Sequence, residues 1–211
     1  GQYNIINNNI NWDLIEKNFK KNKYWIIKPE IGCGGFGIKV FQKYLNIKKY
    51  ITEFNTIATK AESKKKYDNN WLMQKYIDNP LLINNKKFHI RFFIILTNSN
   101  NKIKTYLFKK GIIYVSKNEF TLKNLSFDVH DSHGTTTSKE DANLFPDKIE
   151  ELYGKKNSDK VMNGIINIFN FISKYIKIKC FDNPKKCFCI YGADIMVTNK
   201  YEAKFIEINS N

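Results

Sequence analysis

The sequence predicts a mixed α+β fold in two lobes, with mainly antiparallel sheet. Aromatic and β-branched runs typical of strands recur at 24–28, 38–41, 71–77, 88–97, 103–108, 112–115, 188–197 and 203–208. Few helical segments separate them, so consecutive strands are expected to pair as hairpins instead of alternating with helices in a parallel sheet. A chain of 211 residues with 42% hydrophobic residues can bury one substantial core, or two small ones that share a cleft.

Three segments predict helices. Trp12, Ile15 and Phe19 recur at helical spacing within 11–19, and the segment 47–61 is a second candidate. The segment 159–178 has apolar residues every three to four positions and is the strongest of the three.

The remaining segments have weaker patterns. The polar residues 1–10 are expected to fray, and 116–146, without sustained periodicity, are expected to form a long functional loop. The runs 103–108 and 112–115 are expected to pair with each other across 109–111 as a hairpin.

The net charge of +15 favours acidic partners, because a basic surface attracts and orients anions before contact. Nucleic acid, an anionic membrane surface, a nucleotide and an acidic protein tail all satisfy this condition. No run of 18 apolar residues occurs, so no membrane span is expected. The first residues do not combine a basic stretch with an apolar core, so no secretory signal is expected.

A glycine-rich loop occupies residues 32–37 and satisfies the spacing G-x-G-x-x-G. A dinucleotide-binding loop of this spacing opens a helix, whereas the residues that follow here, 38–41, have strand character. A loop between two antiparallel strands folds over phosphates as a flap, and Lys28 on the first strand could reach back beneath it. The signatures of a P-loop and of a protein kinase are absent, and a plain flexible hairpin is the competing interpretation.

Acidic side chains gather in the last two predicted strands. Asp194 lies inside one strand, and Glu207 and Asn209, two residues apart, share a face of the other. If these strands pair, three oxygen ligands converge on rigid backbone, which suits Mg²⁺ together with phosphates and water. The alternative is that the three side chains face solvent on an edge hairpin.

The middle of the chain carries a basic strand. Lys87, His89 and Arg91 alternate and therefore share one face, where two fixed positive charges suit a triphosphate or a carboxylate. An exposed basic edge strand is the alternative. The apolar run 92–95 argues against it, because it indicates that the strand continues into the core.

Together these motifs resemble the tubulin–tyrosine ligase-like family, from about residue 24 to 211 and in the family's order. The matching motifs are Trp25-Ile26-x-Lys28-Pro29, Gly35-x-Gly37-Ile38, Gln74-Lys75-Tyr76-Ile77, Pro80-Leu81-Leu82, Lys87-Phe88-x-Ile90-Arg91, Gly192-x-Asp194 and Glu207-Ile208-Asn209. The resemblance implies an ATP-grasp fold with nucleotide in a cleft between two lobes. It implies a flank at 1–23, a central lobe with the flap at 24–77, and a lobe with the metal-binding strands at 78–211.

The resemblance also implies roles for individual residues. The cofactors would be ATP and Mg²⁺. The residues implied are Lys28, Gly35, Gly37, Ile38, Gln74, Lys75, Tyr76, Ile77, Lys87, His89 and Asp194 for ATP, Asp194, Glu207 and Asn209 for Mg²⁺, and Arg91 and Lys109 for phosphate or the substrate carboxylate. Two departures stand out. His89 replaces the family's usual Asp, and the segment 126–133 differs from the family's His-Leu-Thr-Asn.

The implied activity joins a free amino acid to an acidic protein tail, such as that of tubulin, through an acyl-phosphate. The implied setting is a monomer in the cytoplasm, associated with microtubules. An ATP-grasp kinase of inositol phosphates would use similar metal-binding strands and is the runner-up. A basic nucleic-acid-binding module is a third interpretation, disfavoured because most aromatic residues occupy core-like strand positions.

Overall fold

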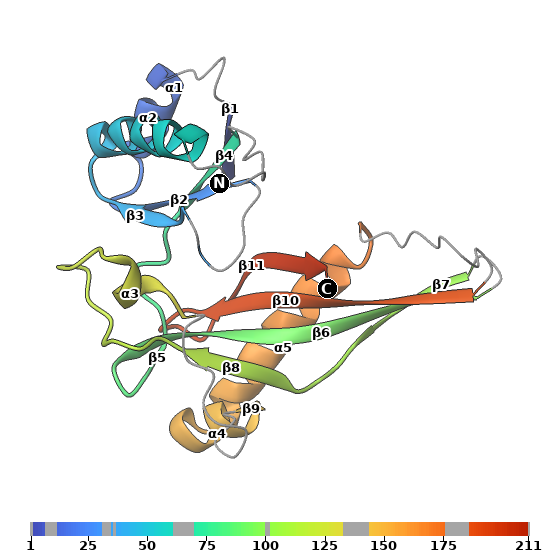
Figure 1. The fold of residues 1–211 in the computed structure, drawn as a ribbon. Coiled ribbons are helices and arrows are strands. Elements are labelled where there is room, and N and C mark those ends of the chain that lie inside the picture. The colour runs from blue at the N-terminus through green and yellow to red at the C-terminus, as the bar shows by residue number, and fades with distance from the viewer. Residues whose placement is uncertain are drawn as a thin grey trace.

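The computed structural model describes residues 2–6, 12–30, 35, 37–60, 70–99, 102–132, 144–175 and 186–210. These residues form helices and two mainly antiparallel sheets, as an α+β protein should (Figure 1). No helix within these ranges is both long and apolar enough to span a bilayer.

The first sheet has four antiparallel strands in the order β1-β4-β2-β3. Its elements are β1 (Gln2–Ile6), α1 (Trp12–Phe19), β2 (Trp25–Pro29), β3 (Lys39–Phe41), α2 (Tyr44–Lys60) and β4 (Asn70–Lys75). Trp25, Ile27 and Met73 point from the sheet into a core that Ile15 of α1 and Ile47 of α2 complete. Burial of this apolar surface holds both helices on the same face of the sheet (Figure 1).

The second sheet has seven strands, with β11-β10-β6-β8-β9 as its main order and with β5 and β7 paired to β6. Its elements are β5 (Leu82–Ile83), β6 (Lys86–Ser99), β7 (Lys102–Leu107), β8 (Gly111–Val115), α3 (Phe127–His130), β9 (Leu144–Phe145), α4 (Asp147–Tyr153), α5 (Lys155–Ile172), β10 (Lys186–Val197) and β11 (Ala203–Ser210). Ile90 and Phe92 of β6 pack against Val161 and Ile165 of α5, which crosses one face of the sheet (Figure 1).

The predicted hairpin between 103–108 and 112–115 is wrong. β7 pairs with the second half of β6 and β8 with the first half, so the two strands lie end to end along one edge of β6. At the break, the backbone N–H of Phe108 still donates to Phe93 O at 2.9 Å. A fourteen-residue β6 offers enough edge for both strands, which local turn signals could not reveal.

The predicted frayed start is also wrong for 2–6, because β1 pairs with β4 through its backbone, which requires no apolar pattern. The helix expected at 11–19 is confirmed as α1, and α2 begins at Tyr44, three residues before the predicted start. The helix expected at 159–178 is observed as α5, which begins at Lys155 and ends at Ile172; residues 176–178 lie outside the described part of the chain.

Candidate functional site

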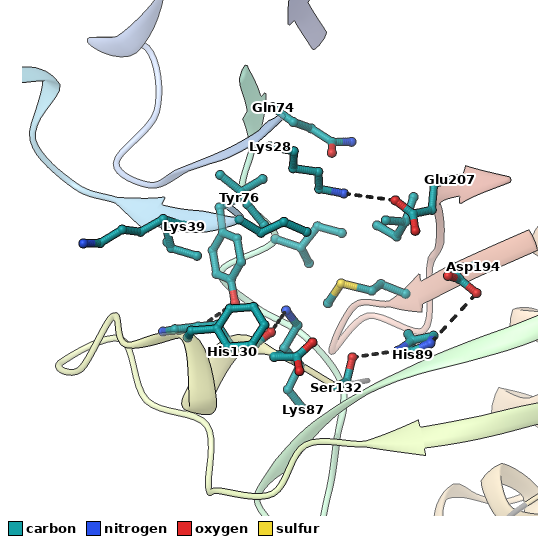
Figure 2. A pocket seen from close by; sticks show the side chains of 18 of the residues that line it. Lys28, Lys39, Gln74, Tyr76, Lys87, His89, His130, Ser132, Asp194 and Glu207 are labelled. Atoms are coloured by element: carbon teal, nitrogen blue, oxygen red, sulfur yellow. Dashed lines mark hydrogen bonds and ion pairs between the residues drawn. The ribbon is translucent and has the colours of Figure 1, made fainter. Parts of the chain in front are cut away.

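A pocket lies where the two sheets approach each other, and both of them line it (Figure 2). The first sheet and its connections contribute Ile26, Lys28, Ile38, Lys39, Val40, Gln74, Lys75, Tyr76 and Ile77. The second sheet and the segment around α3 contribute Lys87, His89, Leu125, Phe127, His130, Asp131, Ser132, Asp194, Met196, Ile206 and Glu207. The pocket therefore combines apolar side chains with seven charged ones, four lysines and three carboxylates.

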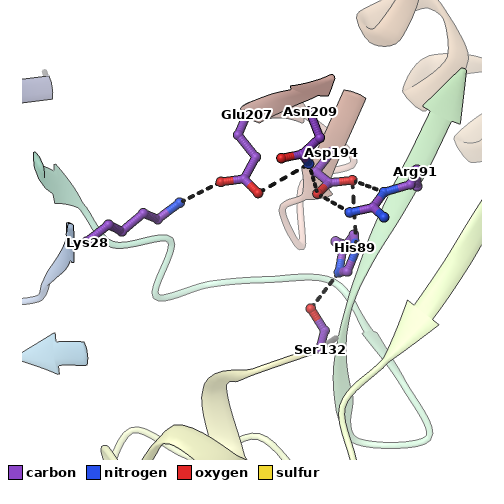
Figure 3. A network of polar contacts seen from close by, with 7 residues as sticks. All are labelled: Lys28, His89, Arg91, Ser132, Asp194, Glu207 and Asn209. Carbon is purple, nitrogen blue, oxygen red and sulfur yellow. Dashed lines mark hydrogen bonds and ion pairs between the residues drawn. The ribbon is translucent and has the colours of Figure 1, made fainter. Parts of the chain in front are cut away.

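The acidic side of the pocket comes from β10 and β11, which pair antiparallel with Asp194 opposite Glu207. Asn209 lies two residues further along β11, on the same face. Its Nδ2 donates to Asp194 Oδ2 at 3.2 Å and to Glu207 Oε1 at 3.4 Å (Figure 3). The three side chains converge, as the sequence predicted they would if the strands paired.

Arg91 neutralises the buried carboxylate of Asp194. Its Nε donates to Oδ1 and its Nη2 to Oδ2, both at 2.8 Å, which is a bidentate pair (Figure 3). The pairing is a consequence of register, because Arg91 of β6 lies directly opposite Asp194 of β10. The Asp194 side chain is only 4% exposed, so an unpaired charge there would be costly. Hydrogen bonding to Asp194 raises the pKa of Arg91.

Lys28 reaches the same acidic group from the other sheet. Its Nζ lies 3.8 Å from Glu207 Oε2, so an ion pair joins β2 to β11 across the pocket (Figure 2). Burial lowers the pKa of Lys28, and the negative charges of Glu207 and Asp194 oppose that shift. This lysine therefore sits where a negative ligand could exchange with Glu207.

Lys87 is the most deeply buried cation of the pocket. Its Nζ donates to the backbone oxygen of His130 at 2.6 Å and lies 5.1 Å from the centre of the Tyr76 ring. Burial, together with the positive charge of Lys28, lowers the pKa of Lys87 to about 8, while Asp131 opposes the shift. A buried ammonium with a carbonyl as its hydrogen-bond acceptor is well placed to receive an anion.

His89 bridges the acidic group and the α3 segment. Its Nδ1 is 2.6 Å from Ser132 Oγ, and its Nε2 is 3.9 Å from Asp194 Oδ1 (Figure 3). The imidazole stacks on Tyr114, with ring centres 5.0 Å apart. His89, which differs from the family's usual Asp, therefore contacts three side chains of the site and its surroundings, those of Ser132, Asp194 and Tyr114.

The segment around α3 closes the pocket from below. The Tyr76 hydroxyl is 2.7 Å from His130 Nδ1 (Figure 2). His130 Nε2 is 2.8 Å from Asn124 O. A carbonyl only accepts, so Nε2 carries the proton, Nδ1 accepts, and Tyr76 donates. Burial lowers the pKa of His130, which favours this neutral form.

The residues present fit a Mg²⁺-nucleotide by their chemistry. Asp194 and Glu207 offer the hard carboxylate oxygens that Mg²⁺ prefers, Asn209 has an amide oxygen, and Lys28 and Lys87 offer charge for phosphates. Within the described ranges, no three His, Cys, Asp or Glu side chains form a metal cluster by themselves. A cation held here would take further ligands from phosphate or water, and it would replace contacts that Arg91 and Lys28 now make.

Most of the sequence-predicted residues come together. Those lining the pocket are Lys28, Ile38, Gln74, Lys75, Tyr76, Ile77, Lys87, His89, Asp194 and Glu207. Arg91 and Asn209 contact Asp194 from the side. Gly35 and Gly37, both with positive φ, belong to the flap that precedes Ile38, and neither lines the pocket. Lys109 does not line the pocket, and it is exposed at the break between β7 and β8.

Sequence reasoning missed several lining residues. Met196 follows Asp194 by two positions on β10, so strand alternation could have revealed it. Lys39 lies on the returning strand after the flap. The segment Leu125–Ser132 gave no periodic signal, because short loops and a single helical turn reach the pocket through tertiary contacts alone.

Comparison with known proteins identifies relatives over nearly the whole chain. The family model described as "Tubulin-tyrosine ligase family" matches residues 8–211. A "Probable alpha-tubulin polyglutamylase Ttll1" of Tetrahymena thermophila is 27% identical over 90% of this chain and 48% of its own length. A "Probable tubulin--tyrosine ligase C12B10.04" of Schizosaccharomyces pombe is 24% identical over 92% of this chain and 53% of its own. A "Protein monoglycylase TTLL8" of Mus musculus is 26% identical over 89% of this chain and 23% of its own. The chain therefore spans about half the length of the first two relatives and less of the third.

Proposed function

The chain belongs to the tubulin–tyrosine ligase family, and we propose that it forms the catalytic part of an ATP- and Mg²⁺-dependent ligase that joins an amino acid to a protein. In this proposal the two sheets are the lobes of an ATP-grasp fold, divided near residue 77, and the pocket between them holds the nucleotide. The named relatives include enzymes that modify tubulin, which favours an acidic tubulin tail as the protein substrate.

One observation carries the proposal. Asp194 and Glu207 face each other on neighbouring strands, and Lys28 from the other sheet reaches Glu207 at 3.8 Å. Two carboxylates and a facing lysine at a junction of two sheets would suit a cation and a phosphate side by side, which supports the proposal. Arg91 contacts Asp194 and Lys28 lies near Glu207, so these charged groups are brought together by the pairing and approach of the strands that carry them.

The residue roles follow from position and charge. Lys28 and Lys87 would bind phosphate oxygens, while Gln74, Lys75 and Ile77 would frame the base and Tyr76 would support it through His130. Asp194, Glu207 and Asn209 would hold Mg²⁺, which when bound neutralises phosphate charge. Arg91, released from Asp194, would face the reacting phosphate or carboxylate. The flap with Gly35 and Gly37 would cover the phosphates. His89 stands where the family usually has Asp, and we assign it to orienting Asp194 and Ser132.

The chemistry proposed is a two-step ligation. A substrate carboxylate attacks the γ-phosphate of ATP, ADP leaves, and an acyl-phosphate remains; an amine then attacks the acyl carbon and inorganic phosphate leaves. The protein positions the reactants and screens charge, so no nucleophilic side chain is required. We place this activity in a monomer in the cytoplasm, on or near microtubules.

Thermal-shift titration with a non-hydrolysable ATP analogue tests the site. We expect stabilisation that is larger with Mg²⁺ than without it, because bound ligand stabilises the folded state by mass action. Lys28→Met should reduce the shift, and Lys204→Met, which removes an exposed lysine of β11, should leave it unchanged. Equal shifts for both variants would count against the phosphate role of Lys28.

A panel of substrates distinguishes the proposed ligase from the second candidate function, an inositol phosphate kinase. An ATP-grasp kinase of inositol phosphates would consume ATP when offered inositol phosphates, whereas the proposed ligase consumes it with an amino acid and an acidic peptide. The family match favours the ligase. Turnover with inositol phosphates alone would reverse this choice.

A further inference from the structure

The second sheet has two faces of different character. α5 covers one of them, where Ile94, Leu96 and Ala193 pack against Phe169 and Ile172. No described helix covers the other face beyond the pocket (Figure 1). We call this other face the outer face, and its residues follow from strand register.

Two rows of paired residues cross the outer face on β7, β6 and β10, namely Tyr106–Ile95–Ile190 and Lys104–Thr97–Phe188. Beside them, Phe108, the residue after β7, donates its backbone N–H to Phe93 O of β6. Directly paired residues project to the same side of a sheet, so these side chains form one surface. We call it the apolar track. A hollow on it is lined by Phe93, Ile95, Phe108, Phe188, Cys189 and Ile190.

The apolar track is exposed to solvent to an unusual degree. Phe188 is 71% exposed, Phe108 56%, Tyr106 49% and Ile190 39%. Single exposed apolar residues are normal, but three of these four line one hollow, which indicates an interaction surface. Exposure of this apolar area costs solubility unless a partner covers it.

The apolar track continues directly from the pocket. The row that carries Arg91, Asp194 and Glu207 lies on the same face, two residues before Phe93 along β6. From Arg91 to Thr97 is six residues, or about 20 Å of strand. A polypeptide in extended form that lies along the track would therefore end at the acidic group of the pocket.

The charge around the apolar track selects an acidic partner. Residues 79–118, which contain β6, β7 and β8, include eight lysine and arginine residues and no Asp or Glu. Lys102, Lys104 and Lys109 are exposed along this edge, as is Lys110, whose Nζ lies 3.6 Å from Asp147 Oδ2. A second copy of the chain would bring another surface of net charge +15 against this basic rim, so self-association is disfavoured.

We propose that the apolar track is the docking surface for the protein substrate, an acidic polypeptide that places at least one large apolar side chain between Phe108 and Phe188. The proposal rests on the proposed function, since the acidic polypeptide is the substrate of that same site. The lysines on the rim steer the acidic chain, the apolar side chain fixes its register, and the end of the chain nearest Arg91 presents the reacting group. Lys109, exposed beside Phe108, acts on the substrate here and not in the pocket.

Fluorescence anisotropy with three labelled peptides tests the proposal. The first is a run of glutamates with one central phenylalanine, the second has alanine in place of the phenylalanine, and the third has glutamines in place of the glutamates. We expect the first to bind the wild-type protein most tightly. Phe188→Ser and Phe108→Ser should each weaken its binding by about tenfold, because an aromatic side chain at the centre of an interface contributes strongly.

Ile103→Ser is the matched control. Ile103 is also an exposed apolar residue of β7, 54% exposed, but its partner Asn98 places it on the face opposite the track. Binding of the first peptide by this variant should equal that of the wild type. The unfolding temperature of each variant is measured as well. Because Phe188 is largely exposed, Phe188→Ser should unfold at the wild-type temperature, so a loss of peptide binding would not come from a folding defect.

Several outcomes would overturn the proposal. These are equal binding of the first two peptides, no effect of either phenylalanine variant, no peptide binding at all, or a wild-type dimer in sedimentation that Phe188→Ser dissociates. The ATP-analogue titration is scored separately. Peptide binding at the track without nucleotide binding would leave the docking surface standing and refute the ligase, while the reverse pattern would refute only the docking surface.

Discussion

The two halves of the outer face of β6 and β10 are made by the same strands and have opposite character. Beside the pocket, Arg91 and Asp194 are ion-paired at 2.8 Å and largely hidden from solvent. At the far ends of the strands, the side chains of Phe188 and Ile190 are exposed to solvent. One face of a sheet can therefore carry a buried charged group at one end and an exposed apolar surface at the other. Strand alternation sends both sets of side chains to that face.

The near half is organised by the cost of burying charge. Each carboxylate there has a cation or an amide in contact, and each cation comes from a different strand. Removing one member leaves another without its partner, so the near half should respond strongly to substitution. The far half has no such dependence and should respond only when a partner is present.

The largest effect is expected for catalysis. Asp194→Ala and Glu207→Ala should each reduce Mg²⁺-ATP turnover by at least about 100-fold, because each removes a carboxylate proposed to hold the Mg²⁺ that neutralises phosphate charge. The measurement is phosphate release in the presence of amino acid and acidic peptide, with circular dichroism to show that the variants are folded. Normal turnover in both variants would refute the assignment of Asp194 and Glu207 as Mg²⁺ ligands.

A large effect on stability is expected for the buried pair itself. Asp194→Ala leaves the Arg91 guanidinium without its bidentate partner, at a cost of about 2–3 kcal/mol in the free energy of unfolding. Glu202→Ala on the turn between β10 and β11 breaks an exposed pair with Lys204, and little change is expected. Urea denaturation of both variants measures the contrast. Similar losses would mean that burial does not distinguish the two pairs.

A smaller effect concerns pH. Because the pKa of Lys87 is lowered to about 8, its charge is present below pH 8 and is lost above it. If that charge binds phosphate, affinity for the ATP analogue should fall by up to about tenfold per pH unit above 8, and binding should take up a proton there. Calorimetry in buffers of different ionisation enthalpy detects the proton. Lys87→Met should flatten the profile, whereas Lys204→Met should preserve it.

The same lysine makes a contribution to stability whose sign is opposite to that of a paired lysine. Its pKa is lower in the folded chain than in the unfolded chain, so the unfolded state binds more protons between pH 8 and the ordinary lysine pKa of 10.5. The free energy of unfolding contributed by Lys87 therefore rises with pH across that window. Lys87→Met should remove this rise.

The smallest effect is expected in the far half. Phe188→Ser should change the free energy of unfolding by no more than about 0.5 kcal/mol, because the side chain is already in water. Binding of the ATP analogue should also be unchanged. A loss of several kcal/mol would show that Phe188 supports the fold, and the comparison between the two halves would then fail.

Much of the fold followed from local pattern. Aromatic and β-branched runs predicted β2, β3, β4, β6, β10 and β11, and helical spacing predicted α1 and α5. Pairing between distant segments did not follow. β7 and β8 share an edge of β6, and β1 joins β4, through backbone hydrogen bonds that leave little trace in side-chain composition.

In the candidate site, too, some features were predictable from the sequence and others were not. Asp194, Glu207 and Asn209 were predictable because a period of two fixes which strand residues share a face, and Lys28 because it precedes a glycine loop. The bidentate contact with Arg91 depends on the register between β6 and β10, and the wall of His130 and Ser132 depends on how an irregular segment folds back. Neither depends on residues that are close in sequence.

The sequence by itself determined the α+β class, the family motifs and the residue types of the charged group, because these depend on local period and composition. Only the tertiary structure decided that Arg91 and Lys28 neutralise the carboxylates, that burial shifts the pKa of Lys87, and that the apolar track lies on the same face as the acidic row. Charge pairing, desolvation and shared faces depend on distances between strands that are far apart in the chain, and those distances are set only when the sheets form.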